Sequence, residues 1–145
     1  MSGVIGFDPA TVTGYAYRDS HGEWVTGVTN VKDKAALALL LSWAKAAGVT
    51  TTYIEDCYYQ NNPRTLKVLQ DIQTRIVIAC EEAHIQTHVI MPTVWYADYG
   101  ITGERAECKL GARRIAKLLG CEPRTQDECD AICIADYGER KEGSI

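Results

Sequence analysis

The chain has 145 residues, of which 46% are hydrophobic, and a formal net charge of −4. This length suits one domain, residues 1–145, whose core buries roughly two thirds of the surface of the unfolded chain. No apolar run approaches the roughly 18 residues of a membrane-spanning helix, and the start, MSGVIGFDPA, lacks the basic and apolar regions of a signal peptide. We therefore expect a cytosolic protein with no membrane partner. The acidic balance argues against nucleic acid unless the carboxylates surround a divalent cation.

The hydrophobic pattern predicts an α/β domain. Residues 3–8, 12–18 and 23–29 are apolar or alternating runs between turn-forming segments, which is typical of three antiparallel strands. Apolar spacing then predicts a helix over 33–47, a strand over 50–56, a helix over 63–83, a strand over 87–91, and helices over 103–119 and 125–137. The order βββαβαβαα joins an antiparallel meander to parallel crossovers, so we predict a mixed five-stranded sheet flanked by helices.

The last predicted helix begins with three acids in the segment TQDECDAICIADYG. Thr125 and Glu128 form a capping-box pattern, which gives Glu128 a structural role. Asp127 and Asp130 lie three residues apart and share another face of the helix. The helix dipole favours acids in a first turn, but a carboxylate at the border of an apolar stripe needs a cation or a donor. These residues alone leave both a structural and a functional role open.

Two further acids stand at predicted strand ends. Asp8 ends the first strand and Glu55 ends the fourth, and the period of two directs Asp56 to the opposite face from Glu55. An acid in such a place can simply cap a turn, but catalytic groups also gather at strand ends. Together with the helical pair, these acids predict a site for Mg²⁺ or Mn²⁺, and two ions bridged by carboxylates are a common device for in-line phosphodiester hydrolysis.

Three motifs resemble RuvC-type Holliday junction resolvases. GFDPATVTGYAY is similar to the opening strand of that family, YIEDCYYQNNPRTLKVLQDIQTRIVIA to its Ile-Glu strand and long helix, and DECDAICIA to its closing helix. The resemblance keeps order and spacing over nearly the whole chain. It departs at Ala10, where the family usually has Gly, and in GERAECKLGARR, where Lys109 is displaced by one residue from the lysine of the family.

The resemblance implies a ribonuclease H-like fold and a homodimer that resolves four-way DNA junctions by paired symmetric nicks in recombination and repair. The metal-binding catalytic acids would be Asp8, Glu55, Asp127 and Asp130, with Asp8 bridging two Mg²⁺ ions and Mn²⁺ as a substitute. Water would attack the phosphate in line and leave a 5′-phosphate and a 3′-hydroxyl. The chain is shorter and more acidic than the cellular enzymes, as phage-borne members of the family can be, so the expected location is the cytosol of a bacterium or of a phage-infected host.

A basic stripe is a candidate DNA contact. Arg105, Lys109 and Arg113 follow a spacing of four along the helix over 103–119, and Lys117 extends the stripe. Glu104 lies off it, so the face is not an alternating ion-pair pattern, although a solvated helix face is an equally good interpretation.

Further candidates follow the fourth strand. Arg64 and Lys67 begin the long helix close to Glu55 in sequence, and Tyr58 and Tyr59 precede it. The tyrosines stack on exposed bases in one interpretation and pack the loop in the other. Trp95 and the tyrosine after it are interpreted as core or helix-surface residues.

The prediction of a homodimer depends on the long helix over residues 63–83. The resemblance places it at the dimer interface, and Val68, Arg75 and Val77 lie outside its main apolar stripe.

Three alternatives remain. One is a nuclease of the same fold that cuts flaps or other branched DNA, and another is a non-catalytic junction-binding protein, against which four gathered like charges argue. A third is a nucleotide-binding domain of the actin and sugar-kinase type. That class needs a second domain and a phosphate loop, so we expect no nucleotide cofactor.

Overall fold

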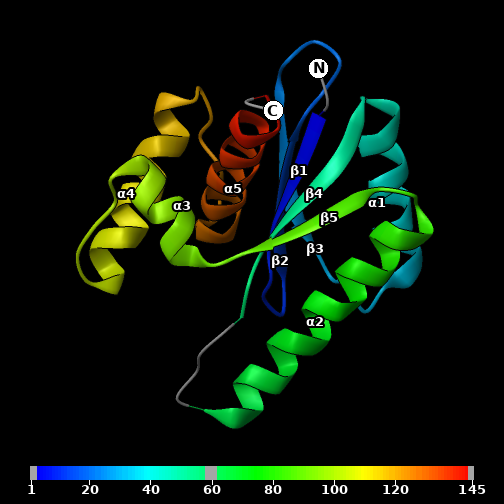
Figure 1. Ribbon diagram of the computed structural model, residues 1–145, viewed down its shortest axis with the longest axis horizontal. Helices are drawn as coiled ribbons and strands as arrows, with labels where there is room; N and C mark the ends of the chain where they lie inside the picture. The colour runs from blue at the N-terminus through cyan, green and yellow to red at the C-terminus, as the bar shows by residue number, and fades with distance from the viewer. Residues whose placement is uncertain (1–2, 58–61, 144–145) are drawn as a thin grey trace.

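A computed structural model describes residues 3–57 and 62–143 (Figure 1). Its strands are β1 (Gly3–Asp8), β2 (Thr13–Arg18), β3 (Trp24–Thr29), β4 (Val49–Glu55) and β5 (Gln86–Ile90). The helices are α1 (Lys34–Ala46), α2 (Pro63–Glu82), α3 (Pro92–Tyr99), α4 (Arg105–Leu118) and α5 (Gln126–Gly143). The strands form one sheet in the order β3-β2-β1-β4-β5. Strands β1 to β3 pair antiparallel, whereas β4 pairs parallel with β1 and β5, which confirms the predicted mixed sheet.

Helix α3 is absent from the predicted order. It has eight residues, PTVWYADY, and its N-cap, Met91, makes no side-chain hydrogen bond. Pro92 was interpreted as the end of a strand, but it occupies the first turn of this helix, where a missing N–H costs nothing. Its apolar residues do not form one face, and sequence periodicity therefore gives no helical signal. The helix ends at Gly100, which has a left-handed φ of 70°.

The two faces of the sheet are covered by different helices (Figure 1). Ile5 and Ile54 belong to the core that includes α1 and α2, whereas Val4 and Tyr53 belong to a core that includes α3, α4 and α5. Because side chains alternate along a strand, Asp8 faces the same side as Val4 and Glu55 the same side as Tyr53. Both strand-end acids are therefore directed to the α5 side of the sheet.

Helix α5 lies directly against β1 and β2 because two glycines leave room for it. A Cβ atom at Gly6 would lie 2.6 Å from the carbonyl oxygen of Ala131, and one at Gly14 would overlap the backbone of Asp127. These approaches bring the first two turns of α5 onto the end of β1. The Gly in the Thr-Gly-Tyr motif is thus required for the position of the helical acids.

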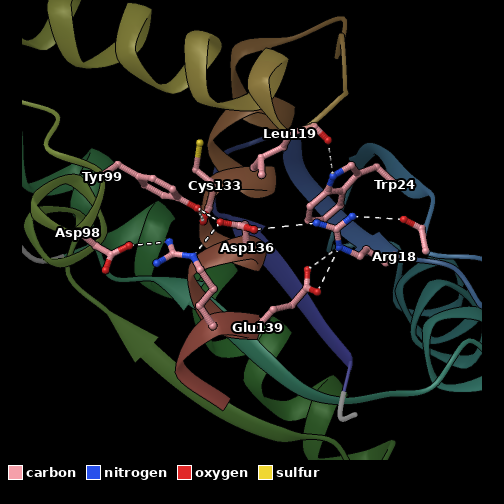
Figure 2. A network of polar contacts seen from close by, with 10 residues as sticks. Arg18, Trp24, Asp98, Tyr99, Leu119, Cys133, Asp136 and Glu139 are labelled. Atoms are coloured by element: carbon pink, nitrogen blue, oxygen red, sulfur yellow. Dashed lines mark hydrogen bonds and ion pairs between the residues drawn. The ribbon is translucent and has the colours of Figure 1, made fainter. Parts of the chain in front are cut away.

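A polar network anchors the far end of α5 (Figure 2). Asp136 accepts hydrogen bonds from the Tyr99 hydroxyl of α3 and from Nε of Arg140, 3.1 Å away. Nε of Arg18, at the end of β2, donates to Glu139 over 3.1 Å. These contacts tie α5 to both the sheet and α3. Removing one partner would cost folding free energy, because it would leave a partly buried charge without its counter-ion. None of the helices in residues 3–57 and 62–143 is both long and apolar enough to cross a membrane.

Candidate active site

The strand-end acids lie side by side. Asp8 and Glu55 are the last residues of the parallel neighbours β1 and β4, in which Phe7 pairs with Ile54. Asp8 is buried, with 6% of its surface exposed, and Glu55 is half-buried. The pairing predicted from strand ends therefore brings two carboxylates to the same edge and the same face of the sheet.

The first turns of α5 add the helical pair. Asp130 is only 1% exposed and Asp127 is half-buried. The hydroxyl of Thr125 accepts from the backbone N–H of Glu128 over 3.1 Å, as the capping box predicts. The Glu128 carboxylate, however, does not bond to the backbone of Thr125. It accepts from the Thr125 hydroxyl (3.1 Å) and from that of Thr26 on β3 (2.9 Å), which anchors this turn to the sheet.

A cavity of about 570 Å³ opens at this edge. Asp8, Glu55 and Asp127 form part of its wall, and residues from the start of α2 and of α4 line it as well. Asp56, the residue after the end of β4, also borders the cavity, which extends to Thr65 and Leu69 of α2. The cavity therefore joins acids from three elements that are distant in sequence.

The acids raise one another's pKa values. Burial raises the pKa of Asp8 well above its ordinary value, and the charges of Glu55 and Asp130 raise it further. Burial and the charge of Asp130 raise the pKa of Glu55 to about 7. Burial also raises the pKa of Asp130, although Lys109 and Gln126 oppose this. The ionised cluster is therefore short of positive charge, which protons or a divalent cation can supply.

Lys109 lies inside this cluster. Its Nζ is 2.6 Å from Oδ2 of Asp130, while Nε2 of Gln126 donates to Oδ1 of the same carboxylate over 3.0 Å. Burial lowers the pKa of Lys109, but the charge and hydrogen bond of Asp130 outweigh this, so the net pKa is raised. The residue predicted as a DNA contact thus serves first as the counter-ion of a buried acid.

The rest of the basic stripe runs away from the cavity along α4. Arg105 borders the cavity and is exposed. Nε of Arg113 donates to Oε1 of Gln126 over 3.0 Å, and Lys117 is exposed near the end of the helix. The structure therefore brings two members of the stripe, Arg105 and Lys109, to the acids and leaves two outside.

The candidates on α2 lie outside the cavity wall. Arg64 and Lys67 are exposed, whereas their neighbours Thr65 and Leu69 border the cavity. Tyr58 and Tyr59 fall outside the residues that the structure describes.

Trp95 contacts the site and was not predicted to do so. Its side chain is fully buried, as expected for a core residue, yet Nε1 donates to Oε2 of Glu55 over 2.8 Å. The next residue, Tyr96, borders the cavity. One signal in the sequence could have indicated this contact, namely the position of Trp95 shortly after β5. The last residue of that strand, Ile90, pairs with Glu55.

The donor set suits a hard divalent cation. Asp8, Glu55, Asp127 and Asp130 offer only carboxylate oxygens, the ligands that Mg²⁺ prefers. Within residues 3–57 and 62–143, however, no three His, Cys, Asp or Glu side chains already form a metal-binding cluster. One oxygen of Asp130 is bound by Lys109 and one of Glu55 by Trp95. The residues therefore fit Mg²⁺ in donor type and charge, and Oδ2 of Asp130 would become available to it once Lys109 moved away.

Comparison with protein-family models and with curated protein sequences finds no match. Solved structures do resemble the chain. Thermus thermophilus RuvC in complex with a Holliday junction substrate has a TM-score of 0.69 and 16% identity, covering 97% of this chain and 96% of that chain. A second T. thermophilus RuvC structure gives 0.67, 20% identity and the same coverage. Ydc2, the yeast mitochondrial Holliday junction resolvase, gives 0.52 and 12% identity over 92% of this chain and 76% of its own.

These similarities extend over nearly the whole chain at low sequence identity. The chain therefore has the ribonuclease H-like fold of RuvC, which confirms the predicted fold class and the structural side of the resemblance. Fold alone does not assign an activity, which depends on the site.

Proposed function

We propose that this chain is a Mg²⁺-dependent endonuclease that resolves four-way DNA junctions by paired symmetric nicks. The observation that carries the proposal is the meeting of carboxylates at one edge of a RuvC-like sheet. Asp8, Glu55 and Asp127 line one cavity, and Lys109, which binds Asp130, lines it too. The T. thermophilus RuvC of the same fold was solved with a Holliday junction substrate, which supports this class of substrate.

The four acids would hold two Mg²⁺ ions, for which Mn²⁺ substitutes. Bound Mg²⁺ supplies charge neutralisation at the scissile phosphate and activation of the attacking water. Asp8 would be the ligand shared between the ions, as the resemblance implies, and the charges of both Glu55 and Asp130 act on it. The protein also keeps this carboxylate largely out of bulk water. Charge interactions are stronger in the protein interior than in bulk water.

Basic residues around the cavity would hold the DNA backbone. Arg105 borders the cavity, and Arg113 and Lys117 continue along α4, so a strand laid over this helix meets successive positive charges. Arg64 and Lys67 on α2 would contact a second arm of the junction. Binding should weaken steeply with salt, since phosphate contacts release counterions.

A homodimer would present two such sites to the two strands of a junction. The exposed face of α2 supports a two-fold pairing. Val68 and Ile78 are each 47% exposed, and Asp71 and Arg75 lie between them, paired over 2.9 Å within the helix. Two antiparallel α2 helices crossing level with residue 73 would set Val68 against Ile78 and Asp71 against Arg75 of a second copy. Val77, predicted to lie outside the apolar stripe, instead packs against the core.

The decisive experiment is cleavage of an end-labelled synthetic four-way junction beside linear duplex and flap controls, with Mg²⁺ and with EDTA. The variants are Asp8→Asn and Asp130→Asn, with Glu23→Gln as a matched control because Glu23 is exposed on another part of the surface. We expect paired symmetric nicks with the wild type and the control in Mg²⁺, and binding without nicks for both aspartate variants.

Other outcomes separate the alternatives. Preferential cutting of the flap would replace the proposal with a broader branched-DNA nuclease. Binding of the junction by the wild type without cutting in Mg²⁺ or Mn²⁺ would indicate a non-catalytic junction-binding protein.

A further inference from the structure

Two tryptophans of this chain satisfy their indole N–H groups in different ways. Nε1 of Trp24 donates to the backbone carbonyl of Leu119 over 3.2 Å (Figure 2). Nε1 of Trp95 donates to the carboxylate of Glu55 over 2.8 Å. An indole N–H is a donor only, and a neutral carbonyl is enough to satisfy it. The use of an acid that lines a cavity therefore points to a role beyond packing.

Trp95 is held rigidly. It is fully buried, and its ring lies 4.3 Å from that of Tyr96 and 6.4 Å from that of Tyr99, measured between centroids. The Tyr99 hydroxyl shares its proton between Asp136 and the carbonyl oxygen of Cys133, 3.1 Å away, and both acceptors belong to α5, which fixes α3 against that helix. The indole N–H is consequently a fixed donor that restricts the position of Glu55.

The hydrogen bond from Trp95 makes the two carboxylate oxygens of Glu55 inequivalent. Oε2 is bound by the indole. Within residues 3–57 and 62–143, no side chain donates a hydrogen bond to Oε1. Glu55 would then bind a cation through one oxygen. Mg²⁺ prefers six ligands in near-ideal octahedral geometry and usually takes one oxygen from each carboxylate, whereas Ca²⁺ accepts six to eight and often binds both oxygens of one.

We propose that Trp95 is a positioning residue that restricts Glu55 to one-oxygen ligation and thereby makes the site select Mg²⁺ over Ca²⁺. This inference rests on the proposed function, because it requires Glu55 to be a metal ligand. It assigns a metal-selecting role to α3, the helix that sequence periodicity did not predict.

The test compares Mg²⁺ and Ca²⁺ binding by calorimetry for the wild type, Trp95→Phe and Trp24→Phe. Trp95→Phe keeps an aromatic ring and removes the donor, while Trp24→Phe removes an indole N–H that bonds to a carbonyl. Loss of a hydrogen bond to a metal ligand typically lowers affinity by about 10-fold to 100-fold. We expect Trp95→Phe to weaken Mg²⁺ by about 10-fold, to leave Ca²⁺ equal or tighter, and Trp24→Phe to leave the ratio unchanged.

A second measurement uses the unmodified protein, in case Trp95→Phe folds poorly. In ¹H–¹⁵N spectra the indole signal of Trp95 should shift during a Mg²⁺ titration, while the signals of Trp24 and Trp43 stay in place. Equal loss of Mg²⁺ and Ca²⁺ affinity in Trp95→Phe, or an indole signal unmoved at saturation, would overturn the inference. If the wild type binds neither cation, both this inference and the proposed function fail. If Glu55→Gln weakens Mg²⁺ but Trp95→Phe keeps the ratio, this inference alone fails.

Discussion

The ammonium group of Lys109 lies 2.6 Å from Oδ2 of Asp130, one of the carboxylates that we propose as ligands of Mg²⁺. Asp130 is almost fully buried, whereas 30% of the Lys109 side chain is exposed. In the metal-free protein the lysine therefore neutralises a carboxylate that cannot reach water. If Asp130 binds Mg²⁺ as proposed, this contact makes the lysine and the cation competitors for one oxygen.

We expect Lys109→Met to lower stability in EDTA by about 1–3 kcal/mol, because it leaves a buried acceptor without one partner. Saturating Mg²⁺ should then stabilise the variant more than the wild type, since Oδ2 of Asp130 is free to bind it. Thermal unfolding in EDTA and in Mg²⁺ measures both effects. Lys117→Met is the matched control, because Lys117 lies exposed on the same helix. An equal Mg²⁺ stabilisation of wild type and Lys109→Met would refute the competition.

The raised pKa values of the acids predict the pH dependence of the metal-free protein. Glu55 has a pKa of about 7 in the folded chain and an ordinary value of 4.5, so between these values the folded state binds more protons than the unfolded state. The contribution of Glu55 to stability is therefore full below about pH 4.5 and is lost as the pH rises to about 7. Thermal unfolding in EDTA across this range should show a smaller fall for Glu55→Gln than for the wild type. Identical slopes in the two proteins would contradict the shift.

The contact between Gly14 and α5 predicts that a single methyl group disturbs the site. In Gly14→Ala the added Cβ overlaps the backbone of Asp127, so the first turn of α5 must move away from β2. We expect a loss of about 1–3 kcal/mol in the free energy of unfolding, as for other overpacked positions. Mg²⁺ affinity should fall as well, because Asp127 and Asp130 move with the helix. Gly143→Ala, where a Cβ meets open space, is the control. A Gly14→Ala variant as stable as the wild type would show that α5 can move away from β2 without a loss in the free energy of unfolding.

The main acids could be predicted from the sequence because each belongs to a local pattern. Asp8 and Glu55 follow apolar strand runs, and alternation assigns their faces, while Asp127 and Asp130 are three apart on a helix. The parallel pairing of β1 and β4 then brings the strand ends together. The face to which each acid points is set by the few residues around it in sequence, and it is the same in the folded chain.

The contacts that modify the acids could not be predicted in the same way. The bond of Lys109 to Asp130 joins residues 21 positions apart, and that of Trp95 to Glu55 joins residues 40 positions apart. Both depend on how α4 and α3 pack, and neither spacing has a local signature. For Trp95 the difficulty is greater, because α3 lacks an amphipathic period and a side-chain cap.

The exposed face of α2 predicts a dimer that depends on charge. If two antiparallel copies meet there, Asp71 faces Arg75 of the second copy, and Asp71→Arg places like charges together. We expect this variant to be monomeric, and Asp71→Arg combined with Arg75→Asp to dimerise again, because the exchange restores opposite charges. Light scattering coupled to gel filtration measures the mass, and Glu23→Lys, at an exposed position outside α2, is the control. The compensated pair is informative because a general loss of stability would not be reversed by a second charge change. A dimer that survives Asp71→Arg would exclude this face as the interface, and a monomeric wild type would leave the proposed paired nicks to two independent molecules.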